Sequence, residues 1–141
     1  MSDAAACIFC KIVRGEAPGF QVCEDALTVT FLDVFPVAAG HTLVVTREHF
    51  ENLFEISPEA LAAVTAASAR VAKAIRKELN PDGLGVFQLN GAAAGQSVFH
   101  YHMHLIPRSA GEGLKLHTRV RGEDQELREM AARLRAALDG V

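Results

Sequence analysis

Three histidines alternate with apolar residues in one short segment, and these side chains are the best suited to chemistry in the chain. His100, His102 and His104 are three of its six histidines. On a β-strand this spacing puts the three imidazoles on one face, about 6.5 Å apart, because successive side chains point to opposite faces. The alternating residues are then expected to face the core: Tyr101, Met103 and Leu105.

A loop of small residues precedes this segment. Residues 90–97 read NGAAAGQS, which offers unhindered backbone N–H groups and a hydroxyl. Such a loop suits a phosphate group. Two other interpretations of the histidines are a histidine-rich surface strand and a pure metal site. Random placement rarely gives strict alternation with apolar residues, and a pure metal site leaves the loop unexplained.

These residue types favour phosphoryl or nucleotidyl transfer. Neutral imidazole is a good nucleophile near pH 7, since its unperturbed pKa is about 6.5. A histidine can therefore attack phosphorus and carry a nucleotidyl group as a phosphoramidate. Neighbouring hydrogen-bond donors stabilise the charged oxygens of the transition state.

The first residues contain a second chemically distinctive pair, Cys7-x-x-Cys10. This spacing is common in half of a zinc site, and a closed tetrahedral site needs two further nitrogen or sulfur ligands. A redox role is disfavoured because no strand precedes the pair. Two buried free thiols are the alternative. The third cysteine, Cys23, makes the count odd, and we expect it to be a thiol without a role.

Periodicity and turn signals predict the elements that must position these residues. The strongest signal is a helix from Pro58 to Leu79, with Ser57 as its N-cap. Shorter helices are predicted over residues 7–13 and 123–138, and strands over 20–24, 27–32, 41–46, 84–90 and 98–106. This order predicts an α+β domain around an antiparallel sheet.

Length and composition narrow the class of protein. The chain has 141 residues, 50% of them hydrophobic, and a formal net charge of -3, which fits one domain. The slightly acidic balance excludes a polybasic nucleic-acid or membrane binder. The sequence has no apolar run of about 18 residues, and its first residues lack the basic and apolar regions of a secretory signal, so we expect a soluble protein that is not exported. Together with the odd cysteine count, these features predict a cytoplasmic protein.

The segment HYHMHLI, residues 100–106, resembles the motif of the histidine triad (HIT) nucleotide-binding proteins. Other segments are also similar to that family: CIFCKIVRGEAP, FLDVFP followed by GHTLVV, REHFENL and GQSVF. The resemblance implies a HIT-like fold in a single domain over residues 1–141, with a core of 7–107 and a C-terminal extension, 108–141, that holds the last helix. It is strongest to small bacterial members that hydrolyse nucleoside phosphoramidates.

The resemblance implies catalytic roles for four residues. His102 would be the nucleophile that attacks the α-phosphorus, and His104 would contact the phosphate. Ser97 would help the leaving group to depart. His41 would lie close to the catalytic histidine.

It also implies a nucleotide-binding set. Gln96 and Asn90 match positions that bind phosphate oxygens, and Asp33 matches the carboxylate that holds the ribose hydroxyls. Turn formation is the alternative role for Asn90, Ser97 and Asp33, and core packing is the alternative for the apolar residues. The base would lie among those apolar residues: Ile8, Phe9, Ile12, Phe31 and Val34.

Similarity to zinc-holding members of the family implies one structural zinc per chain, bound by Cys7, Cys10, His49 and His100. Such a site ties the N-terminal segment to the first triad histidine and leaves no open coordination position. The remaining histidine, His117, is expected in a polar, solvent-exposed loop.

The implied activity is hydrolysis of adenosine 5'-phosphoramidate to AMP and an amine through a covalent intermediate on His102. Alternatives are hydrolysis of dinucleoside polyphosphates and a non-catalytic nucleotide-sensing or partner-binding module. We expect a purine nucleotide of the AMP type as substrate and a homodimer. The helix from Pro58 favours the dimer because it has no charged residue between Glu59 and Arg70 and many alanines outside its apolar stripe. Cover by the chain's own last helix is the alternative.

Overall fold

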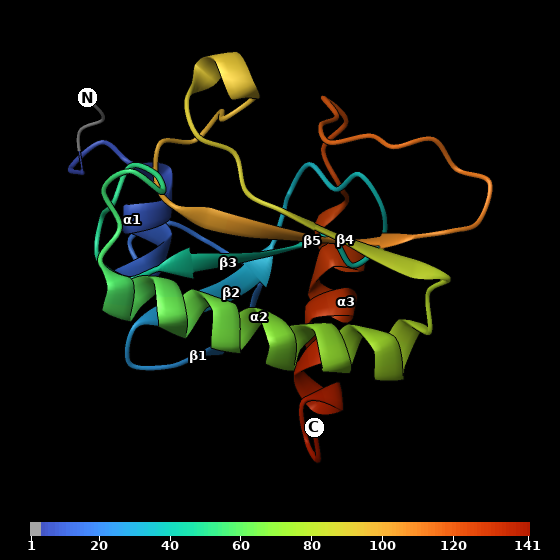
Figure 1. Ribbon diagram of the computed structural model, residues 1–141. Coiled ribbons are helices and arrows are strands. Elements are labelled where there is room, and N and C mark those ends of the chain that lie inside the picture. Colours follow the sequence, from blue (N-terminus) through green and yellow to red (C-terminus); the bar gives the residue numbers. More distant parts are fainter. Residues whose placement is uncertain (1–3) are drawn as a thin grey trace.

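The chain runs through its helices and strands in the predicted order (Figure 1). The computed structural model describes residues 4–141. Its helices are α1 (Ile8–Val13), α2 (Pro58–Leu79) and α3 (Asp124–Ala137), with a short 3-10 helix, η1, at Ala92–Ala94. Its strands are β1 (Gln21–Glu24), β2 (Thr28–Leu32), β3 (Thr42–Thr46), β4 (Gly83–Phe87) and β5 (His102–Arg108). They confirm the predicted α+β class with a five-stranded antiparallel sheet. Over these residues, no helix combines the length and apolarity needed to cross a membrane.

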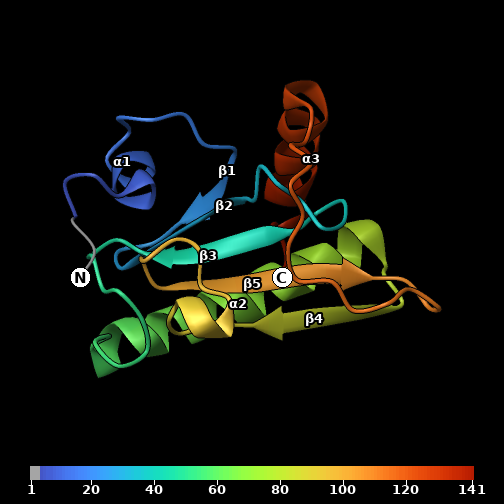
Figure 2. The same cartoon turned by 90° about the horizontal axis from the view of Figure 1, so that it is seen from above.

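The last strand of the sequence lies inside the sheet. The strand order is β1-β2-β3-β5-β4, and all neighbouring strands are antiparallel. From β3 the chain passes through α2 to the edge strand β4 and then returns as β5 between β3 and β4 (Figure 2). β4 ends at Phe87 rather than at Asn90, because the chain turns away there into the loop that holds η1. β5 is therefore hydrogen-bonded on both sides.

The register of β3 and β5 decides which face each histidine occupies. His102 lies opposite Val45, and His104 lies opposite Leu43. Both partners belong to an apolar cluster that α1 completes on one face of the sheet. Val44, between them, packs into the core on the other face. Because side chains alternate along a strand, both histidines point to the α1 side, away from the main core.

The main core lies between the sheet and two helices. α2 starts at a capped turn, where Ser57 Oγ accepts the N–H of Ala60 at 3.1 Å, and it ends at Asn80 in the left-handed conformation. α3 packs against α2 and β1. Buried apolar side chains of α2 and α3 form the centre of this core. They are Val64, Val71 and Ile75 of α2 and Leu127, Ala131 and Leu134 of α3.

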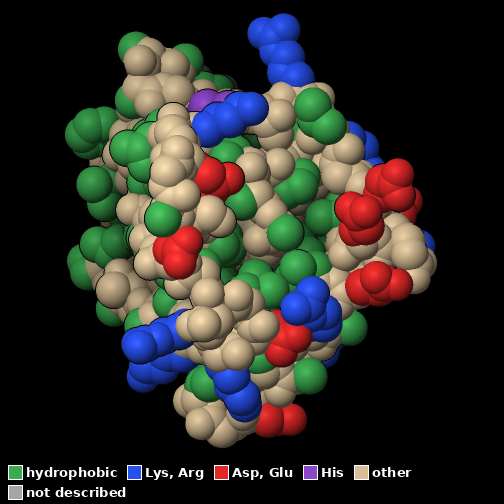
Figure 3. Space-filling model, turned by 90° about the vertical axis from the view of Figure 1, so that its right-hand side faces the viewer, with side chains coloured by type: hydrophobic (Ala, Val, Ile, Leu, Met, Phe, Trp, Pro, Cys, Tyr) green, Lys and Arg blue, Asp and Glu red, His purple; other side chains and the backbone are tan. Residues whose placement is uncertain are grey.

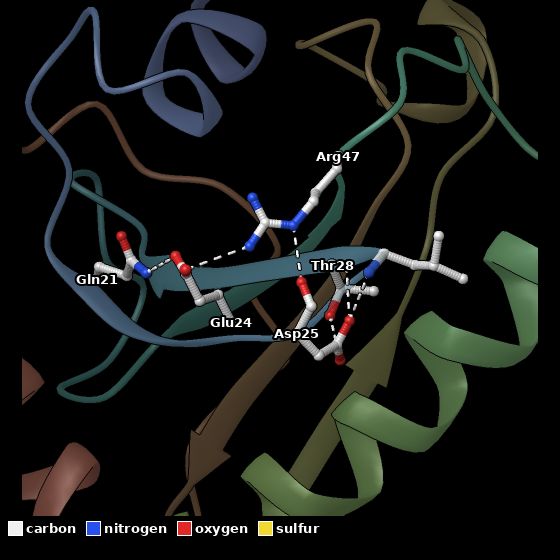
Figure 4. A network of polar contacts seen from close by, with 6 residues as sticks. Gln21, Glu24, Asp25, Thr28 and Arg47 are labelled. Atoms are coloured by element: carbon white, nitrogen blue, oxygen red, sulfur yellow. Dashed lines mark hydrogen bonds and ion pairs between the residues drawn. The ribbon is translucent and has the colours of Figure 1, made fainter.

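The β1–β2 hairpin closes on a turn at Asp25, between the two strands that the sequence predicts (Figure 4). Its Oδ1 accepts the N–H groups of Leu27 and Thr28 at 2.9 and 2.8 Å, and its Oδ2 accepts the Thr28 hydroxyl at 2.8 Å. Arg47 Nε donates to the Asp25 carbonyl at 2.7 Å, and the same guanidinium pairs with Glu24. A side-chain-capped turn of this kind fixes how the two strands meet.

β5 begins later than predicted, at His102 rather than at Val98. The N–H of Tyr101 donates to the Phe50 carbonyl at 2.7 Å, so the backbone just before β5 bonds to the loop after β3 instead of to the sheet. Tyr101 packs into the core as expected. His100 therefore lies off the strand, and the prediction that all three imidazoles share one strand face is wrong for this residue.

Gly40, directly before His41, lies where the fold is closely packed. It has a φ of +89°, and a Cβ there would lie 2.6 Å from Cδ1 of Leu79. Gly111 has a similar φ of +86° with no atom within 4 Å of such a Cβ. We expect Gly40→Ala to lower the free energy of unfolding by about 2–4 kcal/mol and Gly111→Ala by about 1 kcal/mol, because only the first adds a clash to backbone strain. Urea unfolding measures both, and equal losses would contradict the packing.

Candidate functional site

A cavity of about 260 Å³ opens on the α1 side of the sheet. α1, β2 and the residues after it, β3, β5 and three loop segments at residues 18–19, 97–98 and 116–118 form its walls. At one end it is apolar, with Ile8, Phe9, Ile12, Phe31 and Val34 among the lining residues. The polar side chains that line it are Asp33, Ser97, His102, His104, His117 and Thr118.

The backbone of His100 orients the ring of His102. His102 Nδ1 lies 2.6 Å from the His100 carbonyl oxygen, which can only accept, so Nδ1 carries the hydrogen. The lone pair of the neutral ring is then on Nε2. Phe9 packs edge-on against this ring, with centroids 5.1 Å apart. Burial lowers the pKa of His102, which keeps the ring neutral and nucleophilic.

A second chain of hydrogen bonds sets the tautomers of His41 and His104. The N–H of Val37 donates to His41 Nδ1 at 3.1 Å, so neutral His41 carries its hydrogen on Nε2. That nitrogen lies 3.0 Å from His104 Nδ1 and donates to it. His104 consequently carries its own hydrogen on Nε2. The ring of Phe87 stacks on His104 at a centroid distance of 4.8 Å.

Both of these rings are held neutral. Burial is the main cause, and neighbouring histidines add to it, so that the pKa of His41 falls to about 4 and that of His104 to about 3. A neutral His104 offers one N–H, whereas His102, whose ring centroid is 4.8 Å away, offers one lone pair. The cavity thus places a nucleophilic nitrogen beside a hydrogen-bond donor.

Asp33 serves the local turn and also lines the cavity. Its Oδ1 accepts the N–H of Phe35 at 2.8 Å, as the turn alternative predicts. Its Oδ2 lies 3.5 Å from His41 Nε2 and remains available at the cavity wall. Burial raises the pKa of this carboxyl. Ligand atoms of Asp33, His41 and His104 lie within 4.8 Å of one another, a grouping that the linear sequence did not indicate.

The small-residue loop contributes Ser97 to the cavity, but two predicted phosphate ligands face elsewhere. The described residues that line the cavity do not include Asn90 or Gln96. Gln96 Oε1 accepts the N–H of Gly91 at 2.7 Å and its Nε2 donates to the Glu51 carbonyl at 2.7 Å, which holds the loop in place. Asn90 Oδ1 accepts the N–H of Leu53 at 2.8 Å. In this structure both side chains support the loop.

Cys7, Cys10, His49 and His100 form a compact cluster behind the triad. Cys10 Sγ lies 3.2 Å from His49 Nδ1 and 3.4 Å from His100 Nδ1, and Cys7 Sγ lies 3.5 Å from His100 Nδ1. His100 Nε2 donates to the Thr46 carbonyl at 2.6 Å, which leaves its Nδ1 lone pair facing the thiols.

The cluster has the dimensions and the electrostatics of a metal site. All four ligand atoms lie within 4.8 Å of one another, and a tetrahedral zinc needs nitrogen and sulfur atoms about 3.3–3.8 Å apart. Burial and the neighbouring Cys7 raise the pKa of Cys10 to about 11, so the thiolate needs a cation to form at neutral pH. The four residues that were predicted as a metal site are therefore brought together. Cys23 is not among them.

His117 is the residue that sequence reasoning missed. It is exposed, as predicted, but it also lines the cavity, with its ring centroid 6.4 Å from that of His104. Nothing in the local sequence indicates this, because His117 lies outside any motif and reaches the cavity only through the path of residues 109–123.

Comparison with known proteins agrees with this geometry. The chain matches the HIT domain family over residues 14–111. Protein hit of Bacillus subtilis is 47% identical over 114 residues, which are 80% of this chain and 79% of that protein. Adenylylsulfatase HINT3 of Arabidopsis thaliana is 38% identical over 118 residues, which are 79% of this chain and 60% of that protein.

A solved structure is similar over nearly the whole length. The crystal structure of a zinc-bound histidine triad family protein from Mycobacterium smegmatis has a TM-score of 0.84 and 38% sequence identity, and the match covers 96% of this chain and 95% of that chain. With the family match, the antiparallel sheet and the histidine-lined cavity, these similarities lead to one conclusion: the chain belongs to the HIT domain family.

Proposed function

We propose that this protein hydrolyses nucleoside 5'-phosphoramidates, releasing AMP from adenosine 5'-phosphoramidate, by transferring the nucleotidyl group to His102. The observation that carries the proposal is the pair of tautomers in the cavity. His102 offers a lone pair on Nε2, and His104 beside it offers an N–H from Nε2. A nucleophile next to a donor is what attack on a phosphate with developing oxygen charge needs.

The reaction then has two displacements. His102 Nε2 forms a bond to the α-phosphorus, and the P–N bond of the substrate breaks with its electron pair on the departing amine, which takes up a proton with the help of the Ser97 hydroxyl. The His100 carbonyl stabilises the positive charge that His102 gains. Water then bonds to phosphorus, the P–Nε2 bond breaks, and its electron pair returns to His102 while the water proton passes to solvent. The product is AMP.

The walls of the cavity support recognition of a nucleoside. The apolar end suits a purine base, although Phe9 and Phe31 also pack on each other at 5.3 Å and belong to the core cluster. Asp33 Oδ2 is free of the turn that Oδ1 caps, and we assign it to the ribose hydroxyls. Asn90 and Gln96 would contribute indirectly, by holding the loop that carries Ser97.

A second candidate has the same nucleophile and a different leaving group. HINT3, the Arabidopsis relative, is named an adenylylsulfatase, which favours substrates whose α-phosphate is joined through oxygen to a second acidic group. Dinucleoside polyphosphates belong to this class. Turnover of a fluorogenic phosphoramidate, compared with that of diadenosine tetraphosphate, separates the two candidates. A pure binding module would turn over neither substrate.

Replacement of the nucleophile tests the proposal. We expect His102→Asn and His102→Ala to lower kcat by about 1,000-fold or more while AMP still binds, because the variants remove the nitrogen that attacks and leave the rest of the cavity in place. Steady-state kinetics and calorimetric titration with AMP measure the two effects. A variant with near-normal kcat would contradict the assignment.

The neutral state of His104 and His41 can be tested through stability. Their pKa values of about 3 and 4 lie below the unfolded value of about 6.5, so between pH 6.5 and 4 only the unfolded chain gains protons at these sites. Stability should fall with falling pH, by about 1.4 kcal/mol per pH unit for each histidine. Urea unfolding of His104→Gln should show a shallower acid dependence than the parent protein. Parallel curves would contradict the assigned protonation states.

We also propose one structural zinc per chain, held by Cys7, Cys10, His49 and His100. Such an ion stabilises the link between α1 and His100, and four protein ligands leave it no open position for chemistry. Elemental analysis of protein purified without chelator should find about one zinc per chain, and Cys10→Ser should lose it and unfold at a lower temperature. Cys23→Ser is the matched control and should keep the metal. Zinc-free parent protein would refute the site.

We further propose that the protein is a homodimer that pairs through α2 and the edge strand β4. Ala62, Ala66 and Ala69 are exposed on α2 even though α3 packs against this helix, and Val86 of β4 is 52% exposed. Sedimentation at micromolar concentration should give twice the mass of 15.2 kDa. Ala66→Glu should give the monomer, since a buried charge opposes a self-complementary patch. Ala132→Glu, at an exposed alanine of α3, is the control and should remain dimeric.

A further inference from the structure

His117 reaches the cavity from outside the triad and outside the sheet. Its segment leaves the end of β5, passes over the same side of the sheet as the loop with η1, and then enters α3 (Figures 1 and 2). Leu116, His117 and Thr118 line the cavity. The segment therefore brings a third histidine to the cavity that His102, His104 and Ser97 also line.

The ring of His117 lies near the ring of His104 and the small-residue loop. Its plane is 85° from that of His104, at a centroid distance of 6.4 Å. A Cβ placed on Gly95 would lie 3.4 Å from His117 Nε2, so the ring rests against the small-residue loop two positions before Ser97. Most of the apolar residues that line the cavity belong to other elements, α1 among them, and Leu116 comes from the same segment as His117.

Burial is the main cause of the pKa shifts of Asp33, His41, His102 and His104. A positive charge on His117 would add a smaller lowering of the pKa at each of these groups. Its side chain is also exposed, whereas His102 and His104 are buried. Figure 3 shows a face of the molecule on which hydrophobic side chains gather between charged ones. Because His117 is exposed and also lines the cavity, it lies where a group can enter or leave.

We infer that His117 binds the anionic part of an acidic leaving group, so that the site also takes nucleotides whose α-phosphate is joined through oxygen to a phosphate or a sulfate. The inference rests on the proposed nucleotidyl transfer to His102 and adds a second class of leaving group to that reaction. In-line attack by His102 puts the leaving group on the far side of the phosphorus, and we assign the N–H of His104 to an α-phosphate oxygen. His117, an exposed donor whose ring lies near that of His104, is left for the next acidic group.

The bond changes show why the imidazole of His117 would help an acidic group to leave. As His102 Nε2 bonds to phosphorus, the P–O bond to the leaving group breaks and the electron pair stays on that oxygen. The leaving phosphate or sulfate gains one negative charge, and the N–H of His117 donates to one of its oxygens. An uncharged amine leaving group has no such oxygen and gains little from this contact.

Kinetics of His117→Ala test this directly. We expect kcat/KM for adenosine 5'-phosphosulfate and for diadenosine tetraphosphate to fall about 10- to 100-fold, the worth of one hydrogen bond to a charged group. The value for adenosine 5'-phosphoramidate should stay within about twofold. His117→Gln, which keeps an N–H, should recover part of the loss. A loss confined to one of the two acidic substrates would identify whether sulfate or phosphate is the group bound.

The matched control is Leu114→Ala, in the same segment, because Leu114 is 91% exposed and does not line the cavity. It should leave all three substrates unaffected. Equal losses of His117→Ala on acidic and amine substrates would overturn the inference, since the contact would then be to the shared α-phosphate. No loss on any of them would overturn it as well.

Equilibrium binding separates this inference from the proposed function. In the His102→Asn background, adding His117→Ala should weaken ADP binding about 10-fold or more and leave AMP binding unchanged, because only ADP has a β-phosphate in the leaving-group position. If AMP fails to bind the parent protein, the proposed function itself fails. If AMP binds and ADP affinity is insensitive to His117, only the assignment of His117 is wrong.

Discussion

The site depends on how His100 is held. Its carbonyl oxygen accepts the Nδ1 hydrogen of His102, its ring Nε2 donates to the Thr46 carbonyl, and its ring Nδ1 faces two thiols. One residue thus fixes the tautomer of the proposed nucleophile and at the same time belongs to the metal-type cluster. Because His100 is fully buried just before β5, a disturbance of the cluster would be transmitted to His102 through a single hydrogen bond.

The position of β5 gives this arrangement its rigidity. A strand paired on both sides cannot slip by one residue without moving His102 and His104 into the main core and Met103 out of it. The two faces of the sheet therefore have different roles. The face covered by α2 and α3 supplies most of the buried apolar surface, and the face covered by α1 holds the rings, the cavity and the cluster.

The elements were predictable where local chemistry determines them. Ser57 and Pro58 begin α2, Asn80 ends it, and alternating side chains mark β5, so the sequence predicts the fold class. The residues of the metal-type cluster were predicted from the family resemblance. Three features depended on distant partners. His100 leaves the strand because the neighbouring Tyr101 N–H bonds Phe50, Gln96 turns to Gly91 and Glu51, and His117 arrives through an irregular segment. Neither the hydrophobic periodicity of the sequence nor its turn residues predict such contacts between distant residues.

In the proposed reaction, the lone pair on His102 Nε2 attacks the α-phosphorus, and His102 carries the nucleotidyl group. The most direct measurement is mass spectrometry of peptides from protein that is mixed with adenosine 5'-phosphoramidate and quenched within one turnover. We expect an adenylyl group on the peptide that contains His102, and fragmentation should assign it to that residue. The adduct should disappear at longer times. An adenylyl group on His104 or His117, or full turnover with no covalent adduct at any time, would contradict it.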